Sequence, residues 1–443
     1  MPSEDTIYAL SSGRLPAAIA VVRISGSKAR IGLETLTGKI PRARHATRAA
    51  VRDPASGEII DEALVLWFPA PASETGEDIA EIHLHGGRAI LTAVFQVLGK
   101  IEGFRPAEAG EFTRRALYNG KLDLAAVEGL GDLIAADTET QRRQALAQFR
   151  GALSNKVEVW RARLIEALAA LEAAIDFVDE ADVPDDLLTP AMAIARELSA
   201  EIKTALADAH RGERLREGFT VAIAGPPNVG KSTLLNRLAR REVAIVSPSP
   251  GTTRDAIEVA LDLAGIPVVL VDTAGVRETS DLVEVEGVRR ALARADAADL
   301  VLWLAEASDP KPVSPPSSAR RSITVRTKAD LIDSETQRRL QKQGALMLSA
   351  HTGMGMDRLI GILAREAETL GGEPALVTHA RQRHALGEAV ERLESALAVF
   401  APGREEVVAE ELRLAARALG RITGRVDVED VLDQIFKNFC IGK

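Results

Sequence analysis

The most constraining feature of this 443-residue chain is a glycine-rich segment near its middle. Residues 225–232 read Gly-Pro-Pro-Asn-Val-Gly-Lys-Ser and match the phosphate-binding pattern G-x-x-x-x-G-K-[ST]. An apolar run at 220–224 precedes the pattern, and helix-forming residues follow it. In that setting, backbone N–H groups and a helix N-terminus surround a phosphate chain, while Lys231 neutralises the β and γ groups and Ser232 binds Mg²⁺. We therefore expect a nucleotide site between a strand and a helix.

Apolar runs alternate with helical stretches around this segment, which predicts a doubly wound, largely parallel sheet. Before residue 118 the chain reads as mixed α/β, with strands expected at three short apolar segments. The strands expected in these two regions are 18–24, 63–68 and 79–84, then 220–224, 268–271, 300–305, 323–325 and 346–348.

Helical periodicity dominates the rest of the chain. Apolar residues between 146 and 175 recur about every 3.6 positions, which predicts one long amphipathic helix. A second helix is expected at 189–209, and the polar residues 211–214 are expected to form a hinge. After 372 the chain is helical again, so the two helical segments are expected to form one bundle with the nucleotide domain inserted between them. The apolar face of that last segment is expected to contain Leu386, Val390, Leu393, Leu397 and Phe400.

Further motifs point to GTP. Asp272 begins Asp-Thr-Ala-Gly, which looks like the second phosphate-sensing motif of GTPases, and residues 251–255 resemble the first switch, with Thr253 as an Mg²⁺ ligand. Asp330 can accept two hydrogen bonds from guanine that adenine does not offer. Thr327 stands where Asn is usual, and its shorter hydroxyl replaces only part of the hydrogen bonding of an amide. The expected GTP-binding residues are Asn228, Val229, Gly230, Lys231, Ser232, Thr233, Ser247, Pro248, Ser249, Pro250, Gly251, Thr252, Thr253, Asp272, Thr273, Ala274, Gly275, Thr327, Lys328, Asp330, Ser349 and Ala350.

The water-orienting Gln of Ras-like enzymes is replaced here by Val276, which neither donates nor accepts a hydrogen bond. Asn228 suggests another device, because an Asn at this loop position helps to hold K⁺ in some GTPases. The alternative is that Asn228 only shapes the loop. The expected K⁺ ligands are Asn228, Ser247, Ser249 and Thr252, beside the expected Mg²⁺ ligands Ser232 and Thr253.

Composition restricts the kinds of partner and the cellular compartment that we expect for this chain. The chain has 55 Lys and Arg against 64 Asp and Glu, a net charge of −9, which argues against a surface that coats nucleic acid over a wide area. Its one cysteine, Cys440, fits a reducing compartment. No signal sequence is evident, and no run approaches the roughly 18 apolar residues that a membrane span needs. We expect a cytoplasmic protein with no membrane partner.

Segments outside the nucleotide site carry a family resemblance. Residues 76–78 read Gly-Glu-Asp, 119–124 read Asn-Gly-Lys-Leu-Asp-Leu, and 439–443 read Phe-Cys-Ile-Gly-Lys. Together with the segment 272–287, they resemble the tRNA-modification GTPase family known as MnmE or TrmE. The resemblance implies a multidomain α/β protein. Its parts would be an N-terminal α+β domain for tetrahydrofolate binding and dimerisation (1–118), a helical bundle domain in two parts (119–212 and 373–443), and an inserted Ras-like doubly wound P-loop GTPase domain (213–372).

The family likeness also implies a reaction. GTP hydrolysis would accompany aminomethyl or carboxymethylaminomethyl addition to carbon 5 of the wobble uridine of certain tRNAs. The chain would act as a homodimer, in a heterotetramer with an FAD-dependent partner, with 5,10-methylenetetrahydrofolate or its 5-formyl analogue as the folate. Arg23, Glu81, Lys121 and Lys443 match the folate-contacting positions, and Glu284 matches the Glu that activates water.

Alternatives remain at this point. The thiol of Cys440 would assist one-carbon transfer, or the residue is a small buried hydrophobe. An RNA-binding ribosome-assembly GTPase would have nearly the same nucleotide domain, although its usual basic domain is not evident here. A folate-sensing GTP switch that modifies nothing would share every binding residue.

Overall fold

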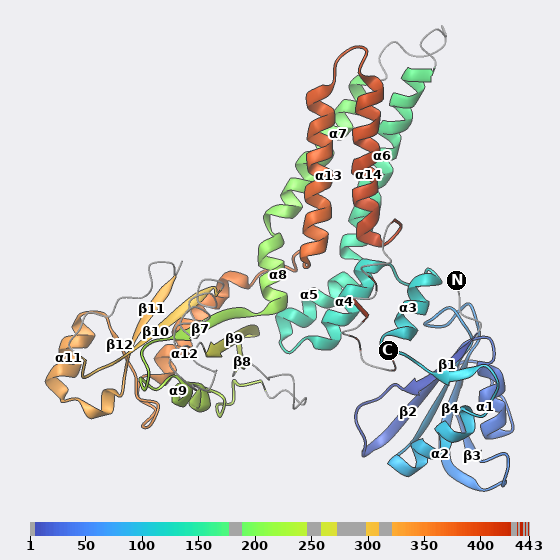
Figure 1. Cartoon of the computed structure of the whole chain (residues 1–443), viewed down its shortest axis with the longest axis horizontal. Helices are drawn as coiled ribbons and strands as arrows, with labels where there is room; N and C mark the ends of the chain where they lie inside the picture. The colour runs from blue at the N-terminus through green and yellow to red at the C-terminus, as the bar shows by residue number, and fades with distance from the viewer. Residues whose placement is uncertain are drawn as a thin grey trace, which may run out of the picture. The chain divides into compact units, whose positions relative to one another are not determined.

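The computed structural model describes residues 5–176, 188–245, 258–272, 298–309 and 321–426, together with residues 432, 435, 436, 439 and 442 near the C-terminus. The chain forms two compact units. One comprises residues 1–131, 148–199 and 388–443, and the other comprises residues 132–147 and 200–387. The first unit holds an N-terminal sheet and a helical bundle, and the second holds a mostly parallel sheet (Figure 1).

The N-terminal sheet has six strands in the order β3-β4-β5-β2-β1-β6. Strand β1 pairs in parallel with β6, and the other pairs are antiparallel. Alternate side chains of the strands form a buried cluster with α1 and α2. The predicted strands at 18–24, 63–68 and 79–84 are confirmed, whereas β1, β3 and β6 were not expected. The elements are β1 Thr6–Leu10, β2 Ala17–Ser25, α1 Ala29–Thr37, β3 Thr47–Arg52, β4 Ile59–Phe68, β5 Ile79–Gly86, α2 Arg88–Leu98, β6 Phe104–Pro106, α3 Glu111–Tyr118 and α4 Leu124–Ala135.

Four long helices form the bundle: α6 Ala152–Asp176, α7 Leu188–Ala207, α13 Ala380–Val399 and α14 Glu405–Thr423. Helices α6 and α14 lie side by side (Figure 1), and Arg413 of α14 forms an ion pair with Glu172 of α6 at 3.0 Å. Arg163 of α6 forms an ion pair with Glu197 of α7, with Nη2 and Oε2 2.6 Å apart. The prediction that helices from before and after the nucleotide domain pack together is therefore confirmed.

Two helical expectations are wrong in detail. The long helix is two helices, α5 Glu139–Phe149 and α6, because Gly151 adopts φ +86° between them. Apolar periodicity continues across the break and conceals it. On α13, Leu386 and Leu393 are buried as expected, but Phe400 lies beyond the helix end and is 38% exposed.

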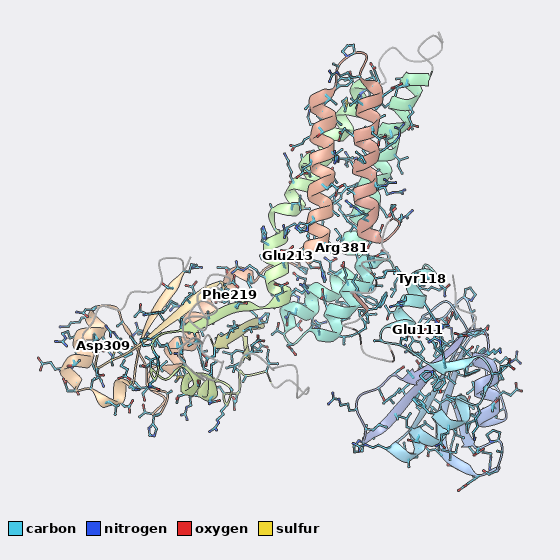
Figure 2. The ribbon with its side chains drawn as sticks, viewed as in Figure 1. Glu111, Tyr118, Glu213, Phe219, Asp309 and Arg381 are labelled. Atoms are coloured by element: carbon cyan, nitrogen blue, oxygen red, sulfur yellow. The ribbon has the colours of Figure 1, made fainter. Side chains whose placement is uncertain are left out.

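The expected hinge at 211–214 is also wrong, because these residues lie within helix α8 Ala209–Glu217. Their charged side chains have partners that are distant in sequence. Glu213, labelled in Figure 2, accepts a hydrogen bond from Arg383 at 2.8 Å, and Arg214 forms an ion pair with Asp299 at 2.7 Å. A Cβ on Gly212 would lie 2.1 Å from the carbonyl oxygen of Val377, so the chain packs closely here. The polar residues at 211–214 therefore lie within a helix and form ion pairs, and they do not form a hinge.

The second sheet has the strand order β12-β11-β10-β7-β9-β8. All its neighbouring pairs are parallel except β8 with β9. The five strands expected here are confirmed, and β8 was missed. The elements are β7 Phe219–Ala224, α9 Lys231–Leu238, β8 Glu258–Leu263, β9 Ile266–Asp272, β10 Leu300–Glu306, β11 Ser322–Thr327, the 3₁₀ turn η1 Ala329–Leu331, α11 Ser334–Lys342, β12 Leu346–Met347, α12 Met356–Ala367 and the 3₁₀ turn η2 Glu368–Leu370.

None of the helices within the described ranges contains the extended apolar run that a transmembrane helix requires.

Candidate functional site

The phosphate-binding pattern lies between β7 and α9, as the sequence predicts. Gly225 adopts φ +148°, and a Cβ on it would lie 2.4 Å from the carbonyl oxygen of Leu304, so only glycine fits. Gly230 adopts φ +98° and caps the N-terminus of α9. Lys231 is 9% exposed, and its ammonium donates to the carbonyl oxygens of Gly225 and Pro226 at 2.9 and 3.0 Å. The loop thus holds its own lysine at the positive end of a helix, where phosphates bind.

A hydroxyl and a carboxylate meet beside this loop. Ser232, in the first turn of α9, donates a hydrogen bond from Oγ to Oδ2 of Asp272 at 3.2 Å. Asp272 ends β9, which pairs with β7, and it is 1% exposed. Oxygen ligands of this kind suit Mg²⁺, which is usually held by few protein oxygens, substrate phosphates and water. The described residues therefore fit the expected magnesium site.

The base-recognition motif follows β11 and is tied to the phosphate loop. Thr327 is 3% exposed, and its hydroxyl donates to the carbonyl oxygen of Val229 at 2.8 Å. Lys328 adopts φ +53° and forms an ion pair with Glu306, a residue that the sequence did not single out. The hydroxyl of Thr327 thus connects the two halves of the nucleotide site, which the sequence alone did not reveal.

Asp330 lies in the turn η1 and is exposed. A hydrogen bond from the Ser349 side chain, and secondarily its own backbone N–H, holds the pKa of Asp330 below its ordinary 3.8. The carboxylate is therefore ionised over the physiological range, as an acceptor of the guanine N–H groups needs to be. Ser349 and Ala350 follow β12, so the motif expected at the guanine carbonyl lies next to Asp330.

A second polar cluster lies in the N-terminal sheet. Arg23 on β2 and Glu81 on β5 are directly opposite each other in the antiparallel register. The guanidinium donates from Nε and Nη2 to Oε1 of Glu81 at 3.0 and 2.9 Å, and its Nη1 lies 2.7 Å from Oε2 of Glu74. A Cβ on Gly76 would lie 3.3 Å from Cε of Lys121, which places that lysine against the loop carrying Glu74. The structure thus connects Arg23, Glu81 and Lys121 through one loop.

The C-terminal segment packs on the same unit. Phe436 is 1% exposed and belongs to a cluster with Leu124 and Val127 of α4. Ser11 donates from its hydroxyl to the carbonyl oxygen of Gly442 at 2.8 Å. Leu10, the residue before Ser11, pairs with Val22, which precedes Arg23 on β2. Gly442 therefore lies near the strand that carries Arg23.

The remaining expected site residues fall outside the described part of the chain. They are Ser247, Pro248, Ser249, Pro250, Gly251, Thr252, Thr253, Thr273, Ala274, Gly275, Glu284, Cys440 and Lys443. Asn228, Val229 and Thr233 are described and lie in the phosphate loop or at the start of α9.

Fold and site together define the class: this is a P-loop protein of the GTPase type, with an oxygen pair that suits magnesium and the Asp330 carboxylate after β11, next to Ser349. Among full-length relatives, "tRNA modification GTPase MnmE" of Azorhizobium caulinodans is 59% identical over 442 residues, covering 100% of this chain and 99% of that protein. The protein of the same name from a Bradyrhizobium species is 56% identical, with 100% of both chains covered. The chain belongs to the MnmE family of tRNA modification GTPases.

Family models agree with this assignment. A model described as "GTP-binding protein TrmE N-terminus" matches residues 6–121, and one described as "MnmE helical domain" matches residues 124–440. The second range encloses the nucleotide-binding sheet. A solved structure of the G domain of the T. maritima FeoB iron transporter is 29% identical and covers 33% of this chain and 98% of its own, with a TM-score of 0.24. The assignment rests on the full-length relatives and the family models.

Proposed function

We propose that this chain hydrolyses GTP in order to modify carbon 5 of the wobble uridine in certain tRNAs, with a tetrahydrofolate as one-carbon donor and an FAD-dependent protein as partner. The observation that carries the proposal is the presence of two sites in one chain of this family. One is the guanine-nucleotide site around Lys231 and Asp330, and the other is the cluster of Arg23, Glu81 and Lys121 in the N-terminal sheet.

At the nucleotide site, attack of water on the γ-phosphorus breaks the bond to the β–γ bridging oxygen and releases GDP and phosphate. Lys231 neutralises charge on the phosphates, and Ser232 with Asp272 would hold Mg²⁺, which would draw charge from the β- and γ-oxygens. Glu284 is assigned the activation of water, because it matches the family's water-activating Glu, and Val276 at the position of the usual Gln neither donates nor accepts a hydrogen bond.

Potassium is proposed as the second cation. Asn228 adopts φ +61° within the phosphate loop, a left-handed conformation that asparagine adopts more readily than most residues other than glycine. Together with Ser247, Ser249 and Thr252, it would hold K⁺, which would neutralise developing charge in place of an arginine finger. Equal rates of GTP hydrolysis in NaCl and KCl would contradict this assignment.

The N-terminal cluster suits a folate chemically. The pterin ring offers an N–H and an amino group that one carboxylate accepts together, and Glu81 is held in position by Arg23. The exposed Lys121 would bind the anionic glutamate tail, assisted by Lys443. Cys440 is assigned to the one-carbon transfer step. The packing of Gly442 beside β1 supports a role for the C-terminal segment at this cluster.

Assembly follows from the same proposal. Two copies would join through their N-terminal domains, and the dimer would bind the FAD-dependent partner as a heterotetramer that acts on tRNA. GTP hydrolysis would drive rearrangement of the domains and would form no bond in the tRNA. The domain limits expected from the sequence, 1–118, 119–212, 213–372 and 373–443, remain part of this proposal.

Mass spectrometry of tRNA nucleosides tests the proposed function. Cells lacking the gene should lose 5-substituted wobble uridines and regain them when an intact copy is restored. A copy carrying Lys121→Ala, which leaves the nucleotide site untouched, should fail to restore them. If the nucleosides persist without the gene, the tRNA reaction is wrong and a folate-sensing GTP switch becomes the better account.

A further inference from the structure

The loop at 73–78, between β4 and β5, contacts two members of the proposed folate cluster. Glu74 forms the 2.7 Å ion pair with Arg23. Gly76 adopts φ +81°, and a Cβ there would lie 2.9 Å from Cβ of Asn119 and 3.3 Å from Cε of Lys121. Any displacement of this loop would therefore move the guanidinium of Arg23 or the ammonium of Lys121.

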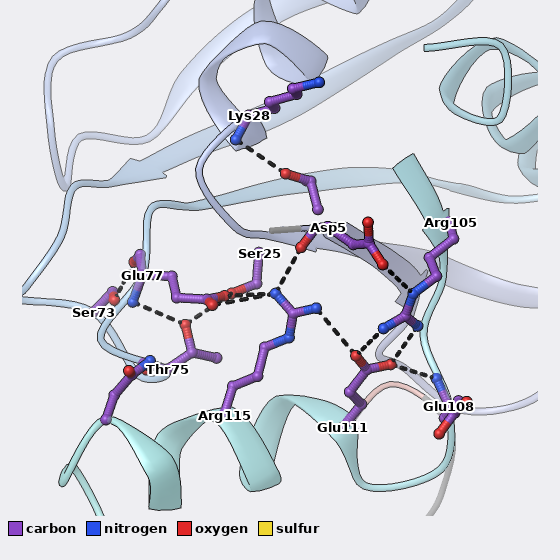
Figure 3. A network of polar contacts seen from close by, with 12 residues as sticks. Asp5, Ser25, Lys28, Ser73, Thr75, Glu77, Arg105, Glu108, Glu111 and Arg115 are labelled. Atoms are coloured by element: carbon purple, nitrogen blue, oxygen red, sulfur yellow. Dashed lines mark hydrogen bonds and ion pairs between the residues drawn. The ribbon is translucent and has the colours of Figure 1, made fainter. Parts of the chain in front are cut away.

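The loop is fixed from inside the domain by the carboxylate of Glu77 (Figure 3). The hydroxyl of Ser25 donates to Oε2 of Glu77 at 2.7 Å, and Nη1 of Arg115 lies 3.2 and 3.1 Å from its two oxygens. Ser25 and Thr75 are fully buried, and their hydroxyl oxygens are 2.8 Å apart. Because the proton of Ser25 is directed to Glu77, Thr75 donates to Ser25. The hydroxyl of Ser25 on β2 thus connects two residues of the loop, because it accepts from Thr75 and donates to Glu77.

Arg115 is itself held by helix α3 and by the start of β1. Its Nη1 donates to the carbonyl oxygen of Asp5 at 2.9 Å, and its Nη2 donates to Glu111 at 3.1 Å. Glu111 also accepts two hydrogen bonds from Arg105, at 2.8 and 2.6 Å. Burial alone raises the pKa of Glu111, but hydrogen bonds from Arg105, from the N–H of Glu108 and from Arg115 together hold it below its ordinary 4.5. The carboxylate of Glu111 is therefore charged at neutral pH.

The side chain of Arg115 is 7% exposed, so its guanidinium is almost completely removed from water. A buried charge of this kind is tolerated only when it is paired and hydrogen-bonded. The carboxylate of Glu77 supplies part of that pairing from the loop, and Glu111 supplies the rest from α3. The position of the loop is thus coupled to the position of α3, and α3 leads directly to Asn119 and Lys121.

We propose that Glu77 and Arg115 are positioning residues for the folate site, which hold the 73–78 loop so that Arg23, Glu81 and Lys121 face one ligand. The inference rests on the proposed function. Neither residue is assigned a contact with the folate. Asn119 contributes to the same effect, because its Nδ2 donates to the carbonyl oxygen of Thr75 at 2.7 Å.

The test is the affinity of the purified full-length protein for 5-formyltetrahydrofolate, measured by isothermal titration calorimetry. Glu77→Gln keeps the shape of the side chain and removes its charge. We expect its Kd to rise about tenfold or more, while GTP hydrolysis, whose residues lie in the other compact unit, stays within about twofold of wild type. The control is Glu62→Gln, which removes the charge of an exposed glutamate paired with Arg48 in the same domain and should leave the Kd unchanged.

The possible outcomes distinguish a failure of this inference from a failure of the proposed folate site. If Glu77→Gln is folded at the assay temperature and binds the folate as tightly as wild type, the pair is only structural and the inference is wrong. If that variant does not fold, Ser25→Ala decides, because it removes one hydrogen bond to Glu77 and leaves the ion pair; we expect its Kd to rise about threefold or more, and an unchanged Kd contradicts the inference. If the wild-type protein binds no folate, the proposed folate site fails, and this inference fails with it.

Discussion

Replacing Thr327 by Val tests the link between base recognition and the phosphate loop. The two side chains have nearly the same shape, but Val cannot donate to the carbonyl oxygen of Val229, which accepts from Thr327 at 2.8 Å. Thr327 is 3% exposed, so water does not easily replace the lost donor. Losing one buried hydrogen bond and leaving its acceptor unpaired costs about 1–3 kcal/mol. Val229 lies within the loop that binds the phosphates, so much of this cost should fall on the nucleotide complex.

If about 1–2 kcal/mol of that cost appears in binding, the affinity for GDP falls about 5- to 30-fold. The assay is displacement of a fluorescent guanine nucleotide by GDP, with thermal unfolding measured in parallel. Thr324→Val is the matched control, because Thr324 lies on the same strand and is not assigned to the site. A Thr327→Val protein that binds GDP as tightly as wild type would refute the argument that this hydroxyl organises the site.

Three further predictions follow from other parts of the chain. Asp330→Asn should weaken GDP binding by about 1–3 kcal/mol, because the amide cannot accept both guanine N–H groups. It should favour xanthosine diphosphate, whose carbonyl in place of the guanine amino group accepts from the amide N–H; competition between the two nucleotides measures this. The Glu111 carboxylate, whose pKa is lowered, stabilises the fold fully above about pH 4.5 and less as the pH falls through its folded-state pKa. Glu111→Gln should therefore cost about 3 kcal/mol at pH 7 and flatten the acid limb of the stability profile, as measured by urea unfolding. Gly442→Ala would place a Cβ 2.2 Å from the carbonyl oxygen of Leu10 and should abolish tRNA modification but not GTP hydrolysis, whereas Gly57→Ala, with φ +74° and nothing within 4 Å, should keep both activities.

Local signals predicted much of the nucleotide site from the sequence. The apolar run before Gly225 and the lysine and serine after Gly230 determine a strand, a loop and a helix N-terminus through short-range sterics and hydrogen bonding. The structure confirms all three. Strand β8 was missed because it alternates, with Val259, Leu261 and Leu263 buried, whereas the strands predicted in this region are nearly continuous apolar runs. It forms by antiparallel pairing with β9.

Long-range pairing explains what the sequence could not predict. Glu77 and Arg115 are 38 residues apart in the chain, and Glu213 and Arg383 are 170 apart. Nothing in either local segment specifies the partner. The sequence around Glu213 predicts a hinge, because charges without local partners are usual in exposed turns. Only the tertiary fold shows that these charges are paired.

Transfer of an isotope label tests the central claim most directly. The purified chain is incubated with its FAD-dependent partner, GTP, tRNA from cells lacking the gene, and tetrahydrofolate carrying ¹³C in its one-carbon unit. Mass spectrometry of the nucleosides should then show a 5-substituted uridine with one added ¹³C, and the label should be absent when GTP is omitted. A modified uridine without the label would contradict the folate assignment, and unmodified uridine in the complete reaction would contradict the proposed function itself.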